Sequence, residues 1–392
     1  MLAACLLTDQ PCEISNVPQI KDVGVMVQLL QGLGAEVTTV DRTTLRVCCR
    51  AVTSDEPHPK HVGRLRGSVL LVGPLLARRG RVRLAPPGGD FPARRTINSH
   101  LQALRGMGVV DESNGGHELV APNGLKAASI YLEEASVTGT ETALLAAAAA
   151  DGYSEIRHAA CEPHVVELCA FLEEMGVGIT GAGTSTIGIT GGMKLTGGKR
   201  RLRGDYIEAG SWAVAAAVTG GEIEVGGVEG ADLEPILAIL GRMNVQCGVE
   251  GDRLIVSSSE LQGIGQITTA PWPGFPSDMV SLVSVLATQA KGRTLIHDWM
   301  YELRLFALEQ LSGMGADLFL CDPHRMIVNG PRKLKGRDLD TRDLRSGMAL
   351  IAASLAAEGI SRVGPLETVE RGYANLVERL KALGAQVSVE QG

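Results

Sequence analysis

A pattern that recurs six times along the 392-residue chain constrains its fold more than any other feature. In each copy, an amphipathic helix with Leu-Gly-Ala or a close variant near its end runs into a short apolar strand. The copies lie about 70 residues apart, so we interpret them as structural repeats. They are LLQGLGAEV from Leu29, LQALRGMGVV from Leu101, LCAFLEEMGVGI from Leu168, ILAILGRMNVQC from Ile236, LEQLSGMGADL from Leu308 and LVERLKALGAQV from Leu376.

A second helix, apolar nearly all round, lies between successive copies, as in TETALLAAAAADG from Thr140 and SGMALIAASLAAEG from Ser346. A helix without a polar face is buried on several sides. Each unit therefore reads as strand, turn, buried helix, strand, amphipathic helix and strand. Six such units are too many for one hydrophobic core. We expect an α/β protein of two domains with three units each, residues 1–203 and 204–392.

The first unit is incomplete. Residues 1–7 read as the tail of its buried helix, and the strand and turn that should precede this helix are absent. In the later units polar residues gather at this turn, where the free amides and dipole of a helix N-terminus suit phosphate or carboxylate groups. These residues are Arg64, Arg66, Ser136 to Glu141, Asp205, Glu208, Ser277, Asp278, Asp343 and Arg345. We therefore expect one-sixth of a binding site to be missing from this chain.

Composition favours a cytoplasmic enzyme. The chain is 45% hydrophobic and 21% charged, with a formal net charge of −7, which argues against a nucleic-acid partner. No apolar run is long enough to cross a membrane. The eight cysteines form no CxxC pair and no zinc-like spacing with histidine, so we expect inert thiols and no metal site.

A loop of Pro87, Gly88, Gly89 and Asp90 carries the clearest chemical signal. Arg94 and Arg95 follow it and Arg66 precedes it. Guanidinium groups bind oxyanions while a carboxylic acid moves a proton. The loop therefore predicts acid catalysis on an anionic substrate.

Ten ordered motifs together resemble the enolpyruvyl transferase family, in its branch that acts on nucleotide sugars, over essentially the whole chain. They are EISNVPQIKDV from Glu13, GRLRGSVLLVGPLLARRG from Gly63, PGGD with Arg95 and His100, SVTGTET from Ser136, EPHVVEL from Glu162, GDYIEAGS from Gly204, FPSDM from Phe275, YELR from Tyr301, TRDLRSG from Thr341 and ERGY from Glu370.

The resemblance implies two inside-out α/β barrels of three repeats each, closing over substrates. It also implies transfer of the enolpyruvyl group of phosphoenolpyruvate to the 3'-hydroxyl of UDP-N-acetylglucosamine, with release of phosphate, for peptidoglycan synthesis. Proton transfer to C3 precedes addition of the hydroxyl at C2, and elimination of phosphate follows. No cofactor is required, and we expect a monomer whose partners are these two small molecules.

Two carboxylates match the catalytic positions of the family. Asp90 stands at the loop position that is Cys in many members and Asp in others, and as the acid for C3 it needs a raised pKa. Asp278 matches the carboxylate that activates the hydroxyl, on a turn that Pro271, Pro273 and Pro276 stiffen. The alternatives are that Asp90 caps a glycine turn and that Asp278 caps a helix.

The remaining matches concern substrate binding. By resemblance, Arg66, Arg95, Arg345 and Arg371 hold phosphoenolpyruvate, phosphate or the nucleotide sugar, and Asp343 and Glu302 orient these arginines. The positions that match contacts to the nucleotide sugar are Arg95, Thr96, Ile97, Asn98, Ser99, Ser136, Val137, Thr138 and Met300.

The chain departs from the family at several of these positions. Thr96 replaces Pro, Asn98 replaces Asp, Thr138-Gly139 replaces Gly-Ala, and Glu134 stands where some members have Lys. The missing first turn carries an adjacent Lys-Asn in the family, and the N-terminal segment there completes the barrel of the second domain. Either Met1 is an internal methionine of a longer protein, which we favour, or the chain is a truncated, inactive relative.

Three other functions compete with this one. A shikimate-type enolpyruvyl transferase shares the fold and the donor, but the PGGD and SVTGTET segments fit the nucleotide-sugar branch better. A non-catalytic UDP-sugar-binding protein would explain the lost Lys-Asn. The RNA-terminal phosphate cyclases repeat a similar unit, but the acidic balance and the lack of a nucleotide-transfer His motif argue against them. Finally, Asp90 in place of the cysteine that fosfomycin alkylates in the family predicts resistance to that drug.

Overall fold

A computed structural model describes residues 1–89, 96–113, 117–301 and 304–390 of the chain. The chain folds into two compact units, Met1–Leu202 and Arg203–Gly392, so the division falls one residue before the predicted boundary at 203. Each unit is described by itself below. Asp90, Arg94, Arg95 and Glu302, which the sequence singles out, lie outside the described residues.

The N-terminal unit contains three sheets, with strand orders β11-β1-β3-β2, β4-β6-β5 and β7-β8-β10-β9. The strands are β1 (Cys12–Ser15), β2 (Glu36–Asp41), β3 (Thr44–Cys48), β4 (Arg81–Leu84), β5 (Val110–Asp111), β6 (His117–Val120), β7 (Ser129–Tyr131), β8 (Gly152–Arg157), β9 (Gly178–Thr180), β10 (Thr186–Gly191) and β11 (Lys199–Arg201). The helices are η1 (Ala3–Leu7), α1 (Lys21–Gly32), α2 (Pro59–Val62), η2 (Arg66–Leu71), α3 (Val72–Arg79), α4 (Asn98–Gly106), α5 (Val137–Ala149) and α6 (Pro163–Glu174).

The C-terminal unit repeats this plan with strand orders β12-β14-β13, β15-β16-β18-β17 and β19-β20. Its strands are β12 (Ile223–Gly226), β13 (Gln246–Glu250), β14 (Arg253–Ser257), β15 (Gln266–Thr268), β16 (Gly292–His297), β17 (Asp317–Asp322), β18 (Arg325–Gly330), β19 (Asp338–Asp340) and β20 (Arg362–Gly364). Its helices are α7 (Tyr206–Thr219), α8 (Gly230–Arg242), η3 (Ser277–Met279), α9 (Val280–Gln289), η4 (Arg304–Leu308), α10 (Glu309–Gly313), α11 (Leu344–Ala356), α12 (Leu366–Val369) and α13 (Leu376–Ala382).

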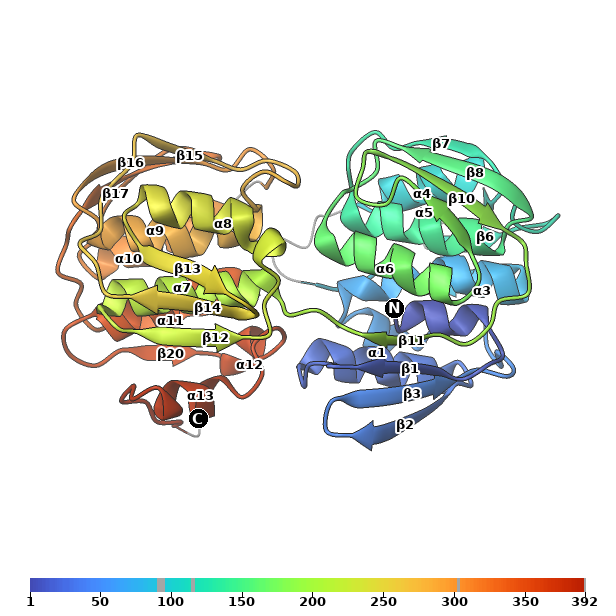
Figure 1. Cartoon of the computed structure of the whole chain (residues 1–392), viewed down its shortest axis with the longest axis horizontal. Coiled ribbons are helices and arrows are strands. Elements are labelled where there is room, and N and C mark those ends of the chain that lie inside the picture. Colours follow the sequence, from blue (N-terminus) through green and yellow to red (C-terminus); the bar gives the residue numbers. More distant parts are fainter. Residues whose placement is uncertain (90–95, 114–116, 302–303, 391–392) are drawn as a thin grey trace. The chain divides into compact units, whose positions relative to one another are not determined.

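The apolar helices form the centre of each unit. In the C-terminal unit α7, α9 and α11 pack against one another, and in the N-terminal unit η1, α3 and α5 do the same (Figure 1). Close approach depends on small residues, since a Cβ atom at Gly73 on α3 would lie 3.1 Å from the backbone nitrogen of Ala146 on α5. The two-domain α/β fold with buried helices inside the sheets is therefore confirmed. Among the described residues no helix is long and apolar enough to span a membrane.

The edge strand of the first sheet differs from the sequence expectation. In three later units the strand before the central helix pairs in parallel with the strand after it, as β7 with β8, β15 with β16 and β19 with β20. In the first repeat, β1, the strand after η1, instead pairs in parallel with β11 from the end of the N-terminal unit, with Glu13 of β1 opposite Lys199.

Candidate active site

In the C-terminal unit, polar side chains gather where the three central helices begin. Asp205 accepts hydrogen bonds from the amides of Ile207 (2.8 Å) and Glu208 (3.1 Å) and so caps α7. Asp343 caps α11 in the same way, accepting from the amides of Arg345 (3.0 Å) and Ser346 (2.9 Å). Capping carboxylates satisfy free amides at a helix N-terminus and fix the direction in which the helix starts. The first turns of α7 and α11 are therefore held firmly.

Asp278, on the 3-10 turn that leads into α9, lies between two arginines. Arg345 on α11 places Nε 3.1 Å and Nη2 3.0 Å from its Oδ2 atom. Arg304 on η4 places Nη1 3.1 Å from its Oδ1 atom. Burial alone would raise the pKa of Asp278, but the positive charges of Arg345 and Arg304 outweigh this effect and hold the pKa well below its usual range. Asp278 is therefore ionised at neutral pH.

Arg345 has a second anchor. Its Nη1 atom lies 3.3 Å from the hydroxyl of Tyr373, which is fully buried. The Tyr373 and Ser211 hydroxyls are 2.7 Å apart, and Ser211 donates a 2.7 Å hydrogen bond to the carbonyl of Ile207 on α7. Burial raises the pKa of Tyr373, which keeps this hydroxyl protonated. The chain of contacts links α11 to α7 through the arginine that faces Asp278.

The other residues predicted for this unit lie around the same turns. Asp343 contacts the backbone amide of Arg345 and not its guanidinium group, so it fixes the start of the helix that carries this arginine. Met300 is 36% exposed, and its amide donates to the Oδ1 atom of Asp298 at 3.2 Å. Arg371 is half-buried, two residues before Tyr373.

In the N-terminal unit the predicted residues gather around Arg66. Its Nη2 atom donates to the carbonyl of Thr96 at 2.5 Å. The loop that precedes Asp90 packs against the same residue, because a Cβ atom at Gly89 would lie 3.1 Å from the Cβ of Arg66. At Gly88 a Cβ atom would lie 2.0 Å from the carbonyl oxygen of Gly63, so only glycine fits. The glycines of the PGGD motif therefore let the loop approach the backbone next to Arg66.

The segment from Thr96 to His100 joins these residues to the start of α5. Ser136 caps α5, accepting from the amide of Gly139 at 3.2 Å, and Ser99 donates to Glu134 at 2.5 Å. Thr96 and Asn98 are exposed, whereas Ile97 is 6% exposed and belongs to the hydrophobic core. Its side chain therefore packs inside the unit, and only its backbone is available to a ligand.

His100 ties α4 to α5. Its Nδ1 atom lies 2.8 Å from the hydroxyl of Thr142, and its Nε2 atom lies 3.2 Å from the hydroxyl of Thr138. Burial, with a smaller contribution from the charge of Arg66, lowers the pKa of His100 to about 3. The imidazole is therefore neutral at physiological pH, and it positions Thr138, which the sequence predicts as a ligand contact.

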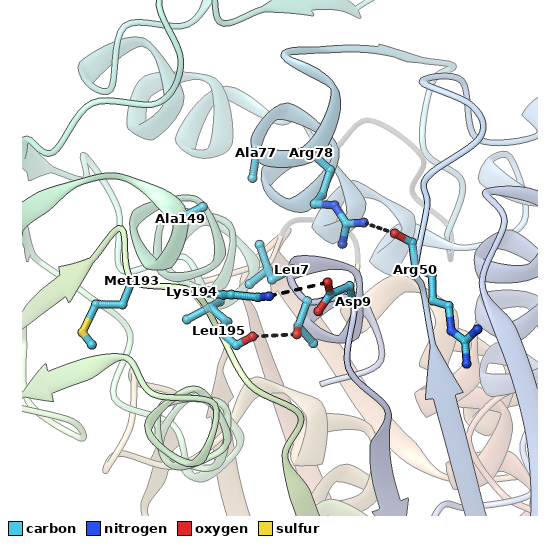
Figure 2. A pocket seen from close by; sticks show the side chains of 10 residues that line it. Leu7, Asp9, Arg50, Ala77, Arg78, Ala149, Met193, Lys194 and Leu195 are labelled. Atoms are coloured by element: carbon cyan, nitrogen blue, oxygen red, sulfur yellow. Dashed lines mark hydrogen bonds and ion pairs between the residues drawn. The ribbon is translucent and has the colours of Figure 1, made fainter.

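A cavity of about 340 Å³ lies at the opposite end of the N-terminal unit, where η1, α3 and α5 finish (Figure 2). Arg78 fills part of its wall and donates to the carbonyls of Leu6 (3.0 Å), Cys49 (3.2 Å) and Arg50 (3.0 Å). Because cations and donors are favoured at helix C-termini, Arg78 has a structural role here. This cavity is separate from the predicted site residues.

Sequence reasoning gave no role to four residues of these networks, Arg304, Asp298, Tyr373 and His100, although His100 is quoted with the PGGD motif. Arg304 and Tyr373 end the YELR and ERGY motifs, so the motifs themselves were the signal that could have found them. Asp298 had no comparable signal, because a single aspartate after a strand is common. Within the described part of the chain no cluster of three or more His, Cys, Asp or Glu side chains could hold a metal ion.

This chain is similar to known proteins that are enolpyruvyl transferases by name or by family description. The family model described as EPSP synthase (3-phosphoshikimate 1-carboxyvinyltransferase) matches residues 1–380. A UDP-N-acetylglucosamine 1-carboxyvinyltransferase of Treponema denticola is 38% identical over 398 residues, covering 100% of this chain and 93% of the relative. One of Bradyrhizobium diazoefficiens is 41% identical over 397 residues, covering 99% and 91%.

Two solved structures share the fold. The enolpyruvyl transferase NikO from Streptomyces tendae superimposes with a TM-score of 0.87 at 25% identity, covering 98% of this chain and 92% of that one. An EPSP synthase from Acinetobacter baumannii superimposes with a TM-score of 0.77 at 20% identity, covering 100% and 95%.

Proposed function

Because the chain belongs to the enolpyruvyl transferase family, we propose that it transfers the enolpyruvyl group of phosphoenolpyruvate to the 3'-hydroxyl of UDP-N-acetylglucosamine and releases phosphate. The curated relatives that cover nearly all of this chain carry the nucleotide-sugar name, which favours this acceptor over shikimate 3-phosphate. In this role the protein acts in the cytoplasm, as a monomer without a cofactor, in peptidoglycan synthesis.

The observation that carries the proposal is Asp278 between Arg345 and Arg304. Addition of a hydroxyl to C2 of phosphoenolpyruvate needs a carboxylate to accept the hydroxyl proton, and cations to hold phosphate and carboxylate oxygens. All three groups stand in the first turn of a helix or 3-10 segment of the C-terminal unit, namely η3, η4 and α11. The cluster therefore combines a proton acceptor with an oxyanion site.

Substrate binding changes the basicity of Asp278. While both arginines are paired with it, its pKa is low and it is a weak base. A phosphate or carboxylate that takes the guanidinium donors of Arg345 and Arg304 would withdraw them from Asp278. Its pKa then rises toward the ordinary value, and it can accept the proton of the sugar hydroxyl. Coupling of this kind makes the base available when the anionic donor is bound.

Asp90 supplies the other proton in this proposal. The acid adds a proton to C3, and the hydroxyl oxygen then bonds to C2 as its proton passes to Asp278, which gives a tetrahedral intermediate. In the elimination the Asp90 carboxylate takes a proton back from C3, the double bond between C2 and C3 re-forms, and phosphate departs with the proton that Asp278 had accepted. The support for Asp90 is its place directly after Gly89, which packs beside Arg66, and Gly88, which packs against the backbone of Gly63.

The polar residues from Thr96 to Ser99 and Ser136 to Thr138 would receive the nucleotide sugar. Ser99 and Glu134 are joined by a short hydrogen bond, so this part of the site presents an acid where some relatives of the family carry a lysine. Arg66, Arg95 and Arg371 would supply positive charge to the phosphates, and Glu302 would orient an arginine. Met300 would contact the uridine or the sugar.

Steady-state phosphate release tests the proposal. The chain is incubated with phosphoenolpyruvate and either UDP-N-acetylglucosamine or shikimate 3-phosphate, and binding of each acceptor is measured by calorimetry. Release that depends on UDP-N-acetylglucosamine supports the proposal. Binding of UDP-N-acetylglucosamine without release would indicate a non-catalytic nucleotide-sugar-binding protein, and release with shikimate 3-phosphate alone would indicate the sister activity.

A further inference from the structure

Asp298 is a fully buried carboxylate at the end of β16, outside the residues assigned to substrate. Its Oδ1 atom accepts from the hydroxyl of Thr269 at 3.0 Å and from the amide of Met300 at 3.2 Å. Its Oδ2 atom accepts from the hydroxyl of Ser277 at 2.6 Å. Burying a carboxylate is costly unless several donors compensate it, so a residue placed there calls for an explanation.

The hydroxyl of Ser277 connects this carboxylate to the candidate active site. It donates to Asp298 and accepts a 2.9 Å hydrogen bond from Nη1 of Arg304. The same Nη1 atom lies 3.1 Å from Oδ1 of Asp278. Arg304 is also held from its other side, because its guanidinium carbon lies 4.4 Å from the ring centre of Tyr301. These contacts therefore fix the Arg304 guanidinium group in the orientation in which it faces Asp278.

The backbone around Asp298 is fixed as well. Its amide donates to the carbonyl of His324 at 2.8 Å, and its carbonyl lies 2.8 Å from Nδ1 of the same histidine. The hydrogen bond from Met300 holds the start of the segment that leads to Arg304. One carboxylate thus ties together the turn that bears Asp278 and the segment that bears Arg304.

We propose that Asp298 is a positioning residue for the transfer reaction, acting through Ser277 to hold Arg304 against Asp278. It does not touch substrate and moves no proton. This inference rests on the proposed function only for its effect on turnover, because the link from Asp298 to Asp278 exists in the protein without substrate.

Three variants separate this link from a general effect on folding. Ser277→Ala removes the hydroxyl between Asp298 and Arg304, and Asp298→Asn removes the acceptor. Thr269→Val is the matched control. It removes a hydrogen bond to the same carboxylate, but Thr269 is not part of the path from Asp298 through Ser277 to Arg304. All three lose a contact of Asp298, but only the first two break the path to Asp278.

We expect Ser277→Ala and Asp298→Asn each to lower kcat by about tenfold, because misplacing a catalytic group reduces the rate of the chemical step more than it reduces substrate affinity. The KM values for both substrates should change less than about threefold. The double variant should be no worse than either single one, because both changes break one path. Thr269→Val should keep kcat within about twofold of wild type. Equal losses in all three single variants, or additive losses in the double variant, would overturn the proposal.

A second readout does not depend on turnover. In protein labelled with ¹³C at aspartate carboxyls, the Asp278 signal, assigned with Asp278→Asn, is titrated with acid. Loosening Arg304 removes part of the positive charge that faces Asp278, so its pKa should move up in Ser277→Ala and Asp298→Asn and stay in place in Thr269→Val. An unchanged titration in both path variants would overturn the inference even in an active enzyme. If wild type released no phosphate, the proposed function would fail, and this titration would still test the link.

Discussion

Asp278 and Arg345, which are 67 residues apart in the chain, form an ion pair between the first turns of two neighbouring central helices, with Nε and Nη2 of the arginine 3.1 and 3.0 Å from one carboxylate oxygen. The pair places a fixed anion beside a fixed cation at the end of the C-terminal unit where the central helices begin. Oxyanion substrates compete with Asp278 for the arginine, and this competition is the basis of the proposed coupling between donor binding and proton transfer.

Replacing Asp278 with Asn tests its role as the proton acceptor. The amide keeps the shape of the side chain but cannot take a proton, so kcat should fall by about 10²-fold or more. Binding of the nucleotide sugar, measured by calorimetry, should change little. A variant that retains more than a tenth of the wild-type kcat would show that another group accepts the proton.

Replacing Tyr373 with Phe tests the second anchor of Arg345. The change removes one buried hydroxyl from Arg345 and Ser211, so unfolding in urea should become easier by about 1–2 kcal/mol. We expect kcat to fall several-fold, because Arg345 loses a fixed contact. Tyr131→Phe serves as the control, since Tyr131 is 56% exposed and lies on β7. Equal effects of the two substitutions would contradict the role given to Tyr373.

The buried imidazole of His100 should make stability depend on pH. Its pKa is lowered to about 3 in the folded protein and is about 6.5 when unfolded, so between these values the unfolded state binds more protons. The contribution of His100 to the free energy of unfolding is therefore fully present above pH 6.5. It is lost as pH falls below this value, and the free energy of unfolding then decreases by up to about 1.4 kcal/mol per pH unit. Urea denaturation of wild type and His100→Gln between pH 5 and 7 measures this difference. Parallel pH profiles for the two proteins would rule out a neutral, buried His100.

Fosfomycin tests the identity of the group at position 90. A carboxylate is a much poorer nucleophile toward the drug than a thiolate, so wild type should keep its activity after prolonged incubation. Asp90→Cys should lose activity with time, and mass spectrometry should find the drug attached to the new cysteine. Time-dependent inactivation of wild type would mean that a different nucleophile of the chain reacts.

The repeats predicted much of the fold because each buried helix and its strand marker leave a period in the sequence. The same reasoning located Asp278 and Arg345, which stand at the predicted turns. It could not show that they pair with each other, since contacts between helices 67 residues apart leave no local pattern. Asp298 was missed for the same reason, because its importance comes from Ser277 and Arg304 in space. The pairing of β11 with β1 was also unpredictable, because a local pattern does not specify which edge a strand joins.

Phosphate release from phosphoenolpyruvate in the presence of UDP-N-acetylglucosamine, with mass spectrometry of the nucleotide product, is the decisive test of the proposed transfer. We expect release of one phosphate for each enolpyruvyl nucleotide sugar formed, and no release with shikimate 3-phosphate as acceptor. Tight binding of UDP-N-acetylglucosamine with no phosphate released and no change in its mass would contradict the proposed transfer.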